Sequence, residues 1–139
     1  MQPDDKILEI GTGSGYQCLV LLELAAEVYT IEYNQNLYTK AVKMFQDLKA
    51  EPKTFCGDGS EGLPDYAPFT KILVTAGAPV VPKSLIEQLT VGGILVIPVG
   101  DEKSQKMVRI TRVEPNEYTK EEFDNFKFVP LLGKSGWNL

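Results

Sequence analysis

Three closely spaced glycines are the strongest chemical signal in the sequence. Gly11, Gly13 and Gly15 follow the apolar run KILEI (6–10) and precede the apolar segment YQCLVLLEL (16–24). A glycine loop between a strand and a helix lets the backbone approach a ligand closely, and the first N–H groups of the helix have no partner within it. The loop is therefore predicted to hold the anionic or carboxylate part of a ligand.

An acidic residue ends the next predicted strand. Glu32 closes the run VYTIE (28–32), about 20 residues after the glycine loop. In a nucleotide-binding sheet, an acid at this place accepts hydrogen bonds from the two ribose hydroxyls, and its charge would repel a 2′-phosphate. A lone glutamate at a strand end is commonly just a solvated residue, so this assignment depends on the glycine loop that precedes it.

A second acid follows the third predicted strand. Asp58 stands in GDGS (57–60), at the carboxyl edge of the sheet, where open parallel sheets bind their ligands. Its neighbours are therefore expected to contact an adenine ring. By itself an Asp-Gly pair is an ordinary turn, so this prediction also depends on the other two signals.

The glycine spacing and the absence of histidine limit the chemistry. The loop reads GxGxG, and Tyr16 occupies the position that would complete a dinucleotide GxGxxG motif, which argues against nicotinamide and flavin cofactors. The sequence has no histidine, which excludes Ser-His-Asp triads, histidine metal ligands and imidazole acid-base catalysis. An NAD-dependent dehydrogenase is disfavoured, because no Tyr–Lys pair has a usable spacing. The main alternative to an enzyme is a module that binds the cofactor or another chain without turnover.

These side chains can meet only if strands and helices position them. Short β-branched apolar runs predict strands over 6–10, 28–32, 54–56, 71–75 and 94–100. Helices are predicted over 16–24, after an N-cap at Asn34, and from Pro82 through 84–89 to a stop at Gly92 and Gly93. The turn-rich segment 57–69 leaves no room for a long helix in the third crossover.

This alternation predicts an α/β fold. Strands separated by helices form a mainly parallel, doubly wound sheet through right-handed crossovers. After Asp101 the pattern changes, because 107–113 alternates around charged residues and 123–132 is a last extended run. Both are predicted to be antiparallel or peripheral strands. A chain of 139 residues fits a single domain, 1–139.

Composition narrows the partners and the compartment. The net charge is −5 and no basic run occurs, so we do not expect nonspecific electrostatic binding to nucleic acid. Cys18 and Cys56 match no metal spacing and suit free thiols in a reducing compartment. The sequence shows no signal peptide and no apolar run of the roughly 20 residues that span a bilayer. We therefore expect a cytoplasmic protein without a membrane or metal site.

Longer strings resemble a known family in order and spacing. They are LEIGTGSGY (8–16), VYTIE (28–32), GDGSEG (57–62), APFTKILVTAGAPVVPKSLIEQL (67–89), GGILVIPVG (92–100) and FVPLLGKSGW (128–137). Together they span nearly the whole chain and resemble the protein-L-isoaspartate O-methyltransferase family. The resemblance implies a Rossmann-like class I methyltransferase fold, three layers deep, with S-adenosylmethionine as cofactor. It also implies methyl transfer to the free carboxylate of isoaspartyl residues in damaged proteins.

The resemblance also implies roles for individual residues. The glycine loop would hold the methionine part of the cofactor, with Glu9 orienting its amino group through the loop. Glu32 would take the ribose hydroxyls, and Asp58 with Gly59 would contact the adenine edge. Five residues would face the peptide substrate: Thr75, Ala76, Pro79, Val129 and Pro130.

The family carries a substantial region before the first strand that has no counterpart here. Met1 stands only a few residues before Lys6, so the family's catalytic hydroxyl cannot be assigned to any position, and we expect a truncated chain. Missing N-terminal helices would leave an apolar sheet face beside the first strand exposed to water, at roughly 25 cal/mol per Å². The sequence therefore predicts a homodimer formed through the uncovered face, or an element exchanged between two copies.

Overall fold

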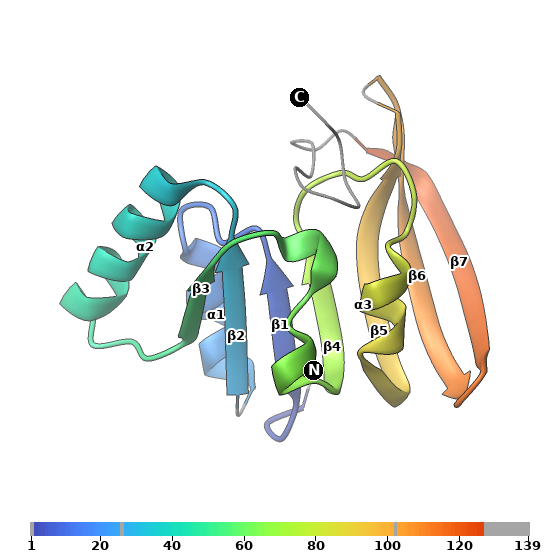
Figure 1. Ribbon diagram of the computed structural model, residues 1–139, viewed down its shortest axis with the longest axis horizontal. Coiled ribbons are helices and arrows are strands. Elements are labelled where there is room, and N and C mark those ends of the chain that lie inside the picture. Colours follow the sequence, from blue (N-terminus) through green and yellow to red (C-terminus); the bar gives the residue numbers. More distant parts are fainter. Residues whose placement is uncertain (1, 26, 102, 127–139) are drawn as a thin grey trace.

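The computed structural model of the chain describes residues 2–25, 27–101 and 103–126. Within them a seven-stranded sheet has the order β3-β2-β1-β4-β5-β6-β7 (Figure 1). The strands are β1 (Lys6–Ile10), β2 (Glu27–Glu32), β3 (Lys53–Cys56), β4 (Phe69–Val74), β5 (Leu89–Gly100), β6 (Gln105–Glu114) and β7 (Glu117–Phe126). The helices are α1 (Tyr16–Leu24), α2 (Gln35–Asp47) and α3 (Lys83–Glu87), with 3-10 turns η1 (Gly59–Glu61) and η2 (Pro64–Tyr66).

The sheet has a parallel part and an antiparallel part. Strands β1 to β5 pair in parallel, and β6 and β7 add to β5 as an antiparallel hairpin. The predicted fold class, a mainly parallel doubly wound sheet with antiparallel C-terminal strands, is confirmed. The chain builds outward from β1 to β3 and then returns to place β4 on the other side of β1. Ligands of open α/β sheets bind at such a switch point, outside the carboxyl ends of the strands.

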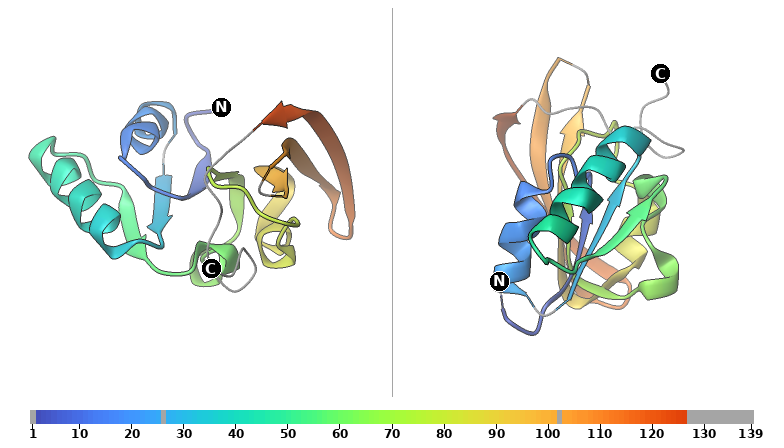
Figure 2. Two further views of the ribbon diagram at one scale, coloured as in Figure 1. Left: turned by 90° about the horizontal axis from the view of Figure 1, so that it is seen from above. Right: turned by 90° about the vertical axis from the view of Figure 1, so that its left-hand side faces the viewer.

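Helices α1 and α2 cover one face of the sheet at its β1–β3 end (Figure 2). Cys18 and Leu21 of α1 pack with Ala41 and Phe45 of α2 against the strands. The predicted cap of α2 is confirmed, because Asn34 Oδ1 accepts a hydrogen bond from the Leu37 N–H at 3.0 Å. This bond satisfies one of the N–H groups that a helix start leaves free.

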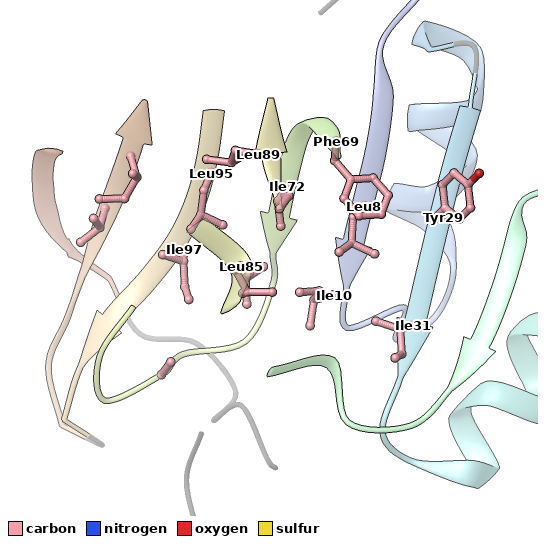
Figure 3. Close-up of a cluster of buried hydrophobic side chains, with 14 residues drawn as sticks. Leu8, Ile10, Tyr29, Ile31, Phe69, Ile72, Leu85, Leu89, Leu95 and Ile97 are labelled. Carbon is pink, nitrogen blue, oxygen red and sulfur yellow. The ribbon is translucent and has the colours of Figure 1, made fainter. Parts of the chain in front are cut away.

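The other face carries the larger apolar core, beneath η1, η2 and α3. Figure 3 shows its side chains lined along successive strands. Phe69, Ile72 and Leu95 are 0% exposed, because this core covers their face of strands β4 and β5. Because this core fixes β1 and β4 side by side, it also fixes the loops that leave their carboxyl ends.

The predicted end of the third helix is wrong. Helix α3 stops at Glu87, and Leu89 already pairs with Phe69 as the first residue of β5. Gly92 and Gly93 lie inside this strand, where the β4–β5 register shifts and Gly92 has a φ of +86°. The glycines therefore accommodate an irregularity in a strand, which a sequence pattern cannot distinguish from a helix stop.

Among the described residues, no helix covers the α1 face of the sheet over β4 to β6 (Figure 2). Leu73, Ile94 and Val96 are half-buried there, and Lys71 forms an ion pair with Asp5 at 3.6 Å. This surface, the uncovered sheet face, is thus partly apolar. None of the helices in the described ranges combines the length and apolar character that crossing a membrane requires.

Candidate functional site

A pocket of about 580 Å³ opens at the carboxyl ends of β1, β2 and β4, beside the switch point. Six of the predicted site residues line it, and they come from four separate segments at this edge of the sheet. They are Gly11, Gly13, Glu32, Gly59, Thr75 and Ala76. The pocket therefore brings together most of the predicted cofactor side and part of the predicted substrate side.

The glycine loop needs its glycines for different reasons. Gly11, Gly13 and Gly15 have φ values of +98°, +54° and +86°, which residues with a side chain rarely adopt. A Cβ on Gly11 would stand 2.3 Å from the Thr75 hydroxyl oxygen, whereas a Cβ on Gly13 would meet nothing within 4 Å. Gly11 thus permits close packing below the loop, and Gly13 keeps the backbone open toward the pocket.

Thr75 ties the end of β4 to this loop. Its N–H donates to the Ile10 carbonyl at 3.0 Å, and its hydroxyl lies 2.8 Å from the Gly11 carbonyl and 3.1 Å from that of Ile10. Thr75 was predicted on the substrate side from the family resemblance. It lines the pocket and also holds the glycine loop, a structural role that the sequence did not indicate.

Glu32 points toward the glycine loop. Its Oε1 accepts a hydrogen bond from the Gly13 N–H at 2.8 Å, and its Oε2 accepts one from the Asn34 N–H at 2.9 Å. The residue is only 7% exposed, yet it lines the pocket. Because each carboxylate oxygen can accept more than one hydrogen bond, Glu32 retains capacity for ligand hydroxyls.

The first turn of α2 forms a wall of the pocket that sequence reasoning missed. Its lining residues share one origin, the segment that directly follows Glu32: Tyr33, Asn34, Gln35, Asn36 and Leu37. The available signal was the capped helix start immediately after a strand-end acid. This wall offers side-chain amides and an aromatic ring next to the carboxylate.

Gly15 and Asp58 do not line the pocket. A Cβ on Gly15 would come within 2.6 Å of Met44 Cε in α2, so this glycine allows close helix packing. Asp58 Oδ1 accepts from the Ser60 N–H at 3.0 Å and from the Ser60 hydroxyl at 2.5 Å, which makes Asp58 the cap of η1. The cap positions Gly59, which does line the pocket.

Glu9 lies beneath the loop, 0% exposed. Its Oε1 accepts from the Thr30 hydroxyl at 2.6 Å, and its Oε2 is buried with no hydrogen-bond partner among the described residues. Burial, reinforced by the nearby Glu32 charge, raises the pKa of Glu9 to about 7. Glu9 therefore does not line the pocket, and any influence on a ligand passes through the loop.

The loop after β4 is fastened to β5. Ala78 donates its N–H to the Pro98 carbonyl at 3.0 Å and accepts from the Gly100 N–H at 3.0 Å. Ala76 lines the pocket, whereas Pro79 does not. Val129 and Pro130, also predicted on the substrate side, lie outside the described residues.

Solved structures with this fold identify the class. One named protein-L-isoaspartate O-methyltransferase matches 97% of this chain and 44% of its own, with a TM-score of 0.87 and 27% identity. A Plasmodium falciparum β-aspartate methyltransferase, solved with S-adenosyl-L-homocysteine, matches 94% of this chain and 67% of its own with a TM-score of 0.77 and 21% identity. The fold is that of the Rossmann-like methyltransferases.

The family follows from the sequence comparison. The model of the protein-L-isoaspartate(D-aspartate) O-methyltransferase family matches residues 1–136, and the chain belongs to this family. A Cytophaga hutchinsonii protein-L-isoaspartate O-methyltransferase is 60% identical over 138 residues, which are 99% of this chain and 62% of that protein. A Flavobacterium psychrophilum relative of the same name is 53% identical over 92% of this chain and 60% of its own length. The chain thus spans less than two thirds of these relatives.

Proposed function

We propose that residues 1–139 form the single S-adenosylmethionine-binding domain of a protein-L-isoaspartate O-methyltransferase. The reaction would transfer the cofactor's methyl group to the free carboxylate of an isoaspartyl residue in a damaged protein. One observation carries most of the proposal: the open backbone at Gly13 and the Glu32 carboxylate, which accepts the Gly13 N–H at 2.8 Å, both line a pocket at the switch point. Membership of the family supports the same conclusion.

The pocket fits the cofactor's chemistry. Gly11 and Gly13 leave room for the methionine part along the backbone, and Glu32 can accept hydrogen bonds from a ribose diol. Gly59 and the first turn of α2 would enclose the adenine end. Glu9, Gly15 and Asp58 would act indirectly, by supporting the loops that line the pocket.

The bound cofactor would supply an electrophilic methyl group on its sulfonium. A carboxylic acid with an ordinary pKa near 4 is already ionised at pH 7, so the substrate needs positioning more than a base. Thr75 and Ala76, which line the pocket, are proposed to face the peptide, and Pro79, Val129 and Pro130 keep the same proposed role. No residue of this chain is assigned as the family's catalytic hydroxyl.

Two further expectations from the sequence remain predictions. The first is a cytoplasmic location, which is inferred from the composition and the two thiols. The second is a homodimer formed through the uncovered sheet face. The competing function is a module that binds the cofactor, or a second copy, without turnover.

A transfer assay separates these alternatives. The chain is incubated with methyl-labelled S-adenosylmethionine and an isoaspartyl peptide, with the same peptide containing ordinary aspartate as control. The proposal predicts base-labile label on the isoaspartyl peptide only. Cofactor binding without label would favour the binding module, and absence of both would contradict the proposed function.

A further inference from the structure

A chain of three buried polar groups runs below the glycine loop. The hydroxyl oxygens of Thr12 and Thr30 lie 2.6 Å apart, and the Thr30 hydroxyl donates to Glu9 Oε1, also at 2.6 Å. Thr12 is 6% exposed, and Thr30 and Glu9 are 0% exposed. The three groups come from the loop, from β2 and from β1, so they connect the glycine loop to two central strands.

The hydrogen bonds in this chain have a direction. A threonine hydroxyl carries a single proton, and that of Thr30 is donated to Glu9. The proton between the two threonine oxygens must therefore come from Thr12. Glu9 can accept in either charge state, because a proton on Glu9 can reside on Oε2, which has no hydrogen-bond partner among the described residues.

We propose that Thr12 and Thr30 are positioning residues, which form a hydroxyl relay to Glu9 that holds the glycine loop in its ligand-binding shape. The relay secures the loop from below. Two further hydrogen bonds hold the loop: Glu32 accepts the Gly13 N–H, and the Thr75 hydroxyl donates to the Gly11 carbonyl. A loop of flexible residues pays conformational entropy when a ligand orders it, and a relay that orders the loop beforehand lowers this cost.

Because the three groups of the relay are buried, water cannot replace a hydrogen bond that is lost from it. A buried acceptor such as Glu9 Oε1 loses a full hydrogen bond if its donor is removed, and Thr12 would then lose its acceptor as well. Loss of the relay should therefore weaken the hydrogen bonds that the loop's backbone amides donate. Two loop amides report on this directly: Gly13, which donates to Glu32, and Gly15, which donates to the Thr12 carbonyl at 2.9 Å.

The test removes the central hydroxyl with little change in shape. Thr30→Val is compared with Thr30→Ser, which keeps the hydroxyl, and with Thr111→Val, the same change at a half-buried position on the distant strand β6. Amide hydrogen exchange is followed by NMR at Gly13 and Gly15, with the Tyr38 amide of α2 as an internal reference. Binding of S-adenosylhomocysteine is measured by calorimetry on the same samples.

The relay predicts a local effect that the hydroxyl restores. In Thr30→Val the Gly13 and Gly15 amides should exchange at least about tenfold faster than in the wild type, Tyr38 should be unchanged, and binding should weaken about tenfold. Thr30→Ser should recover most of the amide protection and most of the binding affinity. Thr111→Val should change neither the exchange of the loop amides nor the affinity. Unchanged loop amides, uniform acceleration across the sheet, or failure of Thr30→Ser to restore protection would overturn the proposal.

The binding measurement rests on the proposed function, whereas the exchange measurement does not. If the wild type fails to bind S-adenosylhomocysteine, the proposed function fails, and the exchange pattern still decides whether the relay orders the loop. If the wild type binds and Thr30→Val binds equally well, the relay has no positioning role, although the proposed function stands.

Discussion

Two glutamates flank the glycine loop in contrasting environments. Glu32 accepts one backbone N–H on each oxygen and lines the pocket, so it can meet a ligand directly. Glu9 is fully buried and has one hydroxyl donor, so its charged form is destabilised. The difference supports the proposal that Glu32 contacts the ligand and that Glu9 supports the loop.

The raised pKa of Glu9 predicts a pH-dependent stability. Between its ordinary value of 4.5 and about 7, the folded state binds more protons at Glu9 than the unfolded state, so the free energy of unfolding falls as pH rises through this window. The loss attributable to Glu9 is on the order of 3 kcal/mol. Denaturant unfolding between pH 5 and pH 8 should show this slope in the wild type and not in Glu9→Gln. Glu23→Gln, at an exposed position of α1, serves as control, and a Glu9→Gln slope parallel to the wild type would contradict the prediction.

Gly11 has a positive φ and also packs closely against the Thr75 hydroxyl. Gly11→Ala should cost more than the roughly 1–2 kcal/mol of a left-handed residue, because the new methyl group would meet the Thr75 hydroxyl. Gly92→Ala is the matched control, since Gly92 has a φ of +86° and nothing within 4 Å of a Cβ. Thermal unfolding of both variants measures the difference, and equal losses would show that the Thr75 contact is unimportant.

Helix α2 is the element that links the fold to the pocket wall. Asn34→Ala removes the bond from the Leu37 N–H and should lower the free energy of unfolding by about 1 kcal/mol. Asn36→Ala changes a neighbouring amide that lines the pocket, and its effect should stay within about 0.5 kcal/mol. Denaturant titration distinguishes the two. A similar loss in both would mean that the cap is not what stabilises the helix start.

Strands could be predicted better than helix ends and side-chain roles. The runs at 6–10 and 28–32 predict strands because they are short and rich in β-branched and apolar residues. The end of α3 was missed because Gly92 looks the same in a bulged strand and after a helix. The close approach of Gly15 to Met44 depends on tertiary packing that no motif records, whereas the cap that Asp58 forms with Ser60 is local and looks the same in sequence as a ligand contact.

The residues of the pocket wall at the start of α2 could not be predicted from the spacing of motifs in the sequence. Tyr33 and Asn36 carry no recognisable motif, and they line the pocket only because α2 starts directly at the end of β2. Conversely, Gly11, Gly13 and Glu32 could be predicted because backbone freedom and strand-end position are encoded locally.

Within the part of the chain that the structure describes, no helix covers the uncovered sheet face. Because this face mixes half-buried apolar residues with ion pairs, a second copy is predicted to cover it. Val96→Glu, beside Arg109 on the next strand, should shift the chain from dimer to monomer in sedimentation velocity runs. Val80→Glu, at an exposed loop position, should not. A wild type that stays monomeric at high concentration would contradict the prediction.

The identity of the pocket's ligand decides whether this fold works as a methyltransferase domain. Calorimetric titration of S-adenosylhomocysteine into the wild type and into Glu32→Gln tests it most directly, because Glu32 combines burial, loop contacts and pocket exposure. We predict one binding site in the wild type and affinity at least about tenfold weaker in Glu32→Gln. No binding to the wild type, or equal affinity in both proteins, would contradict the assignment of this pocket to the adenosyl cofactor.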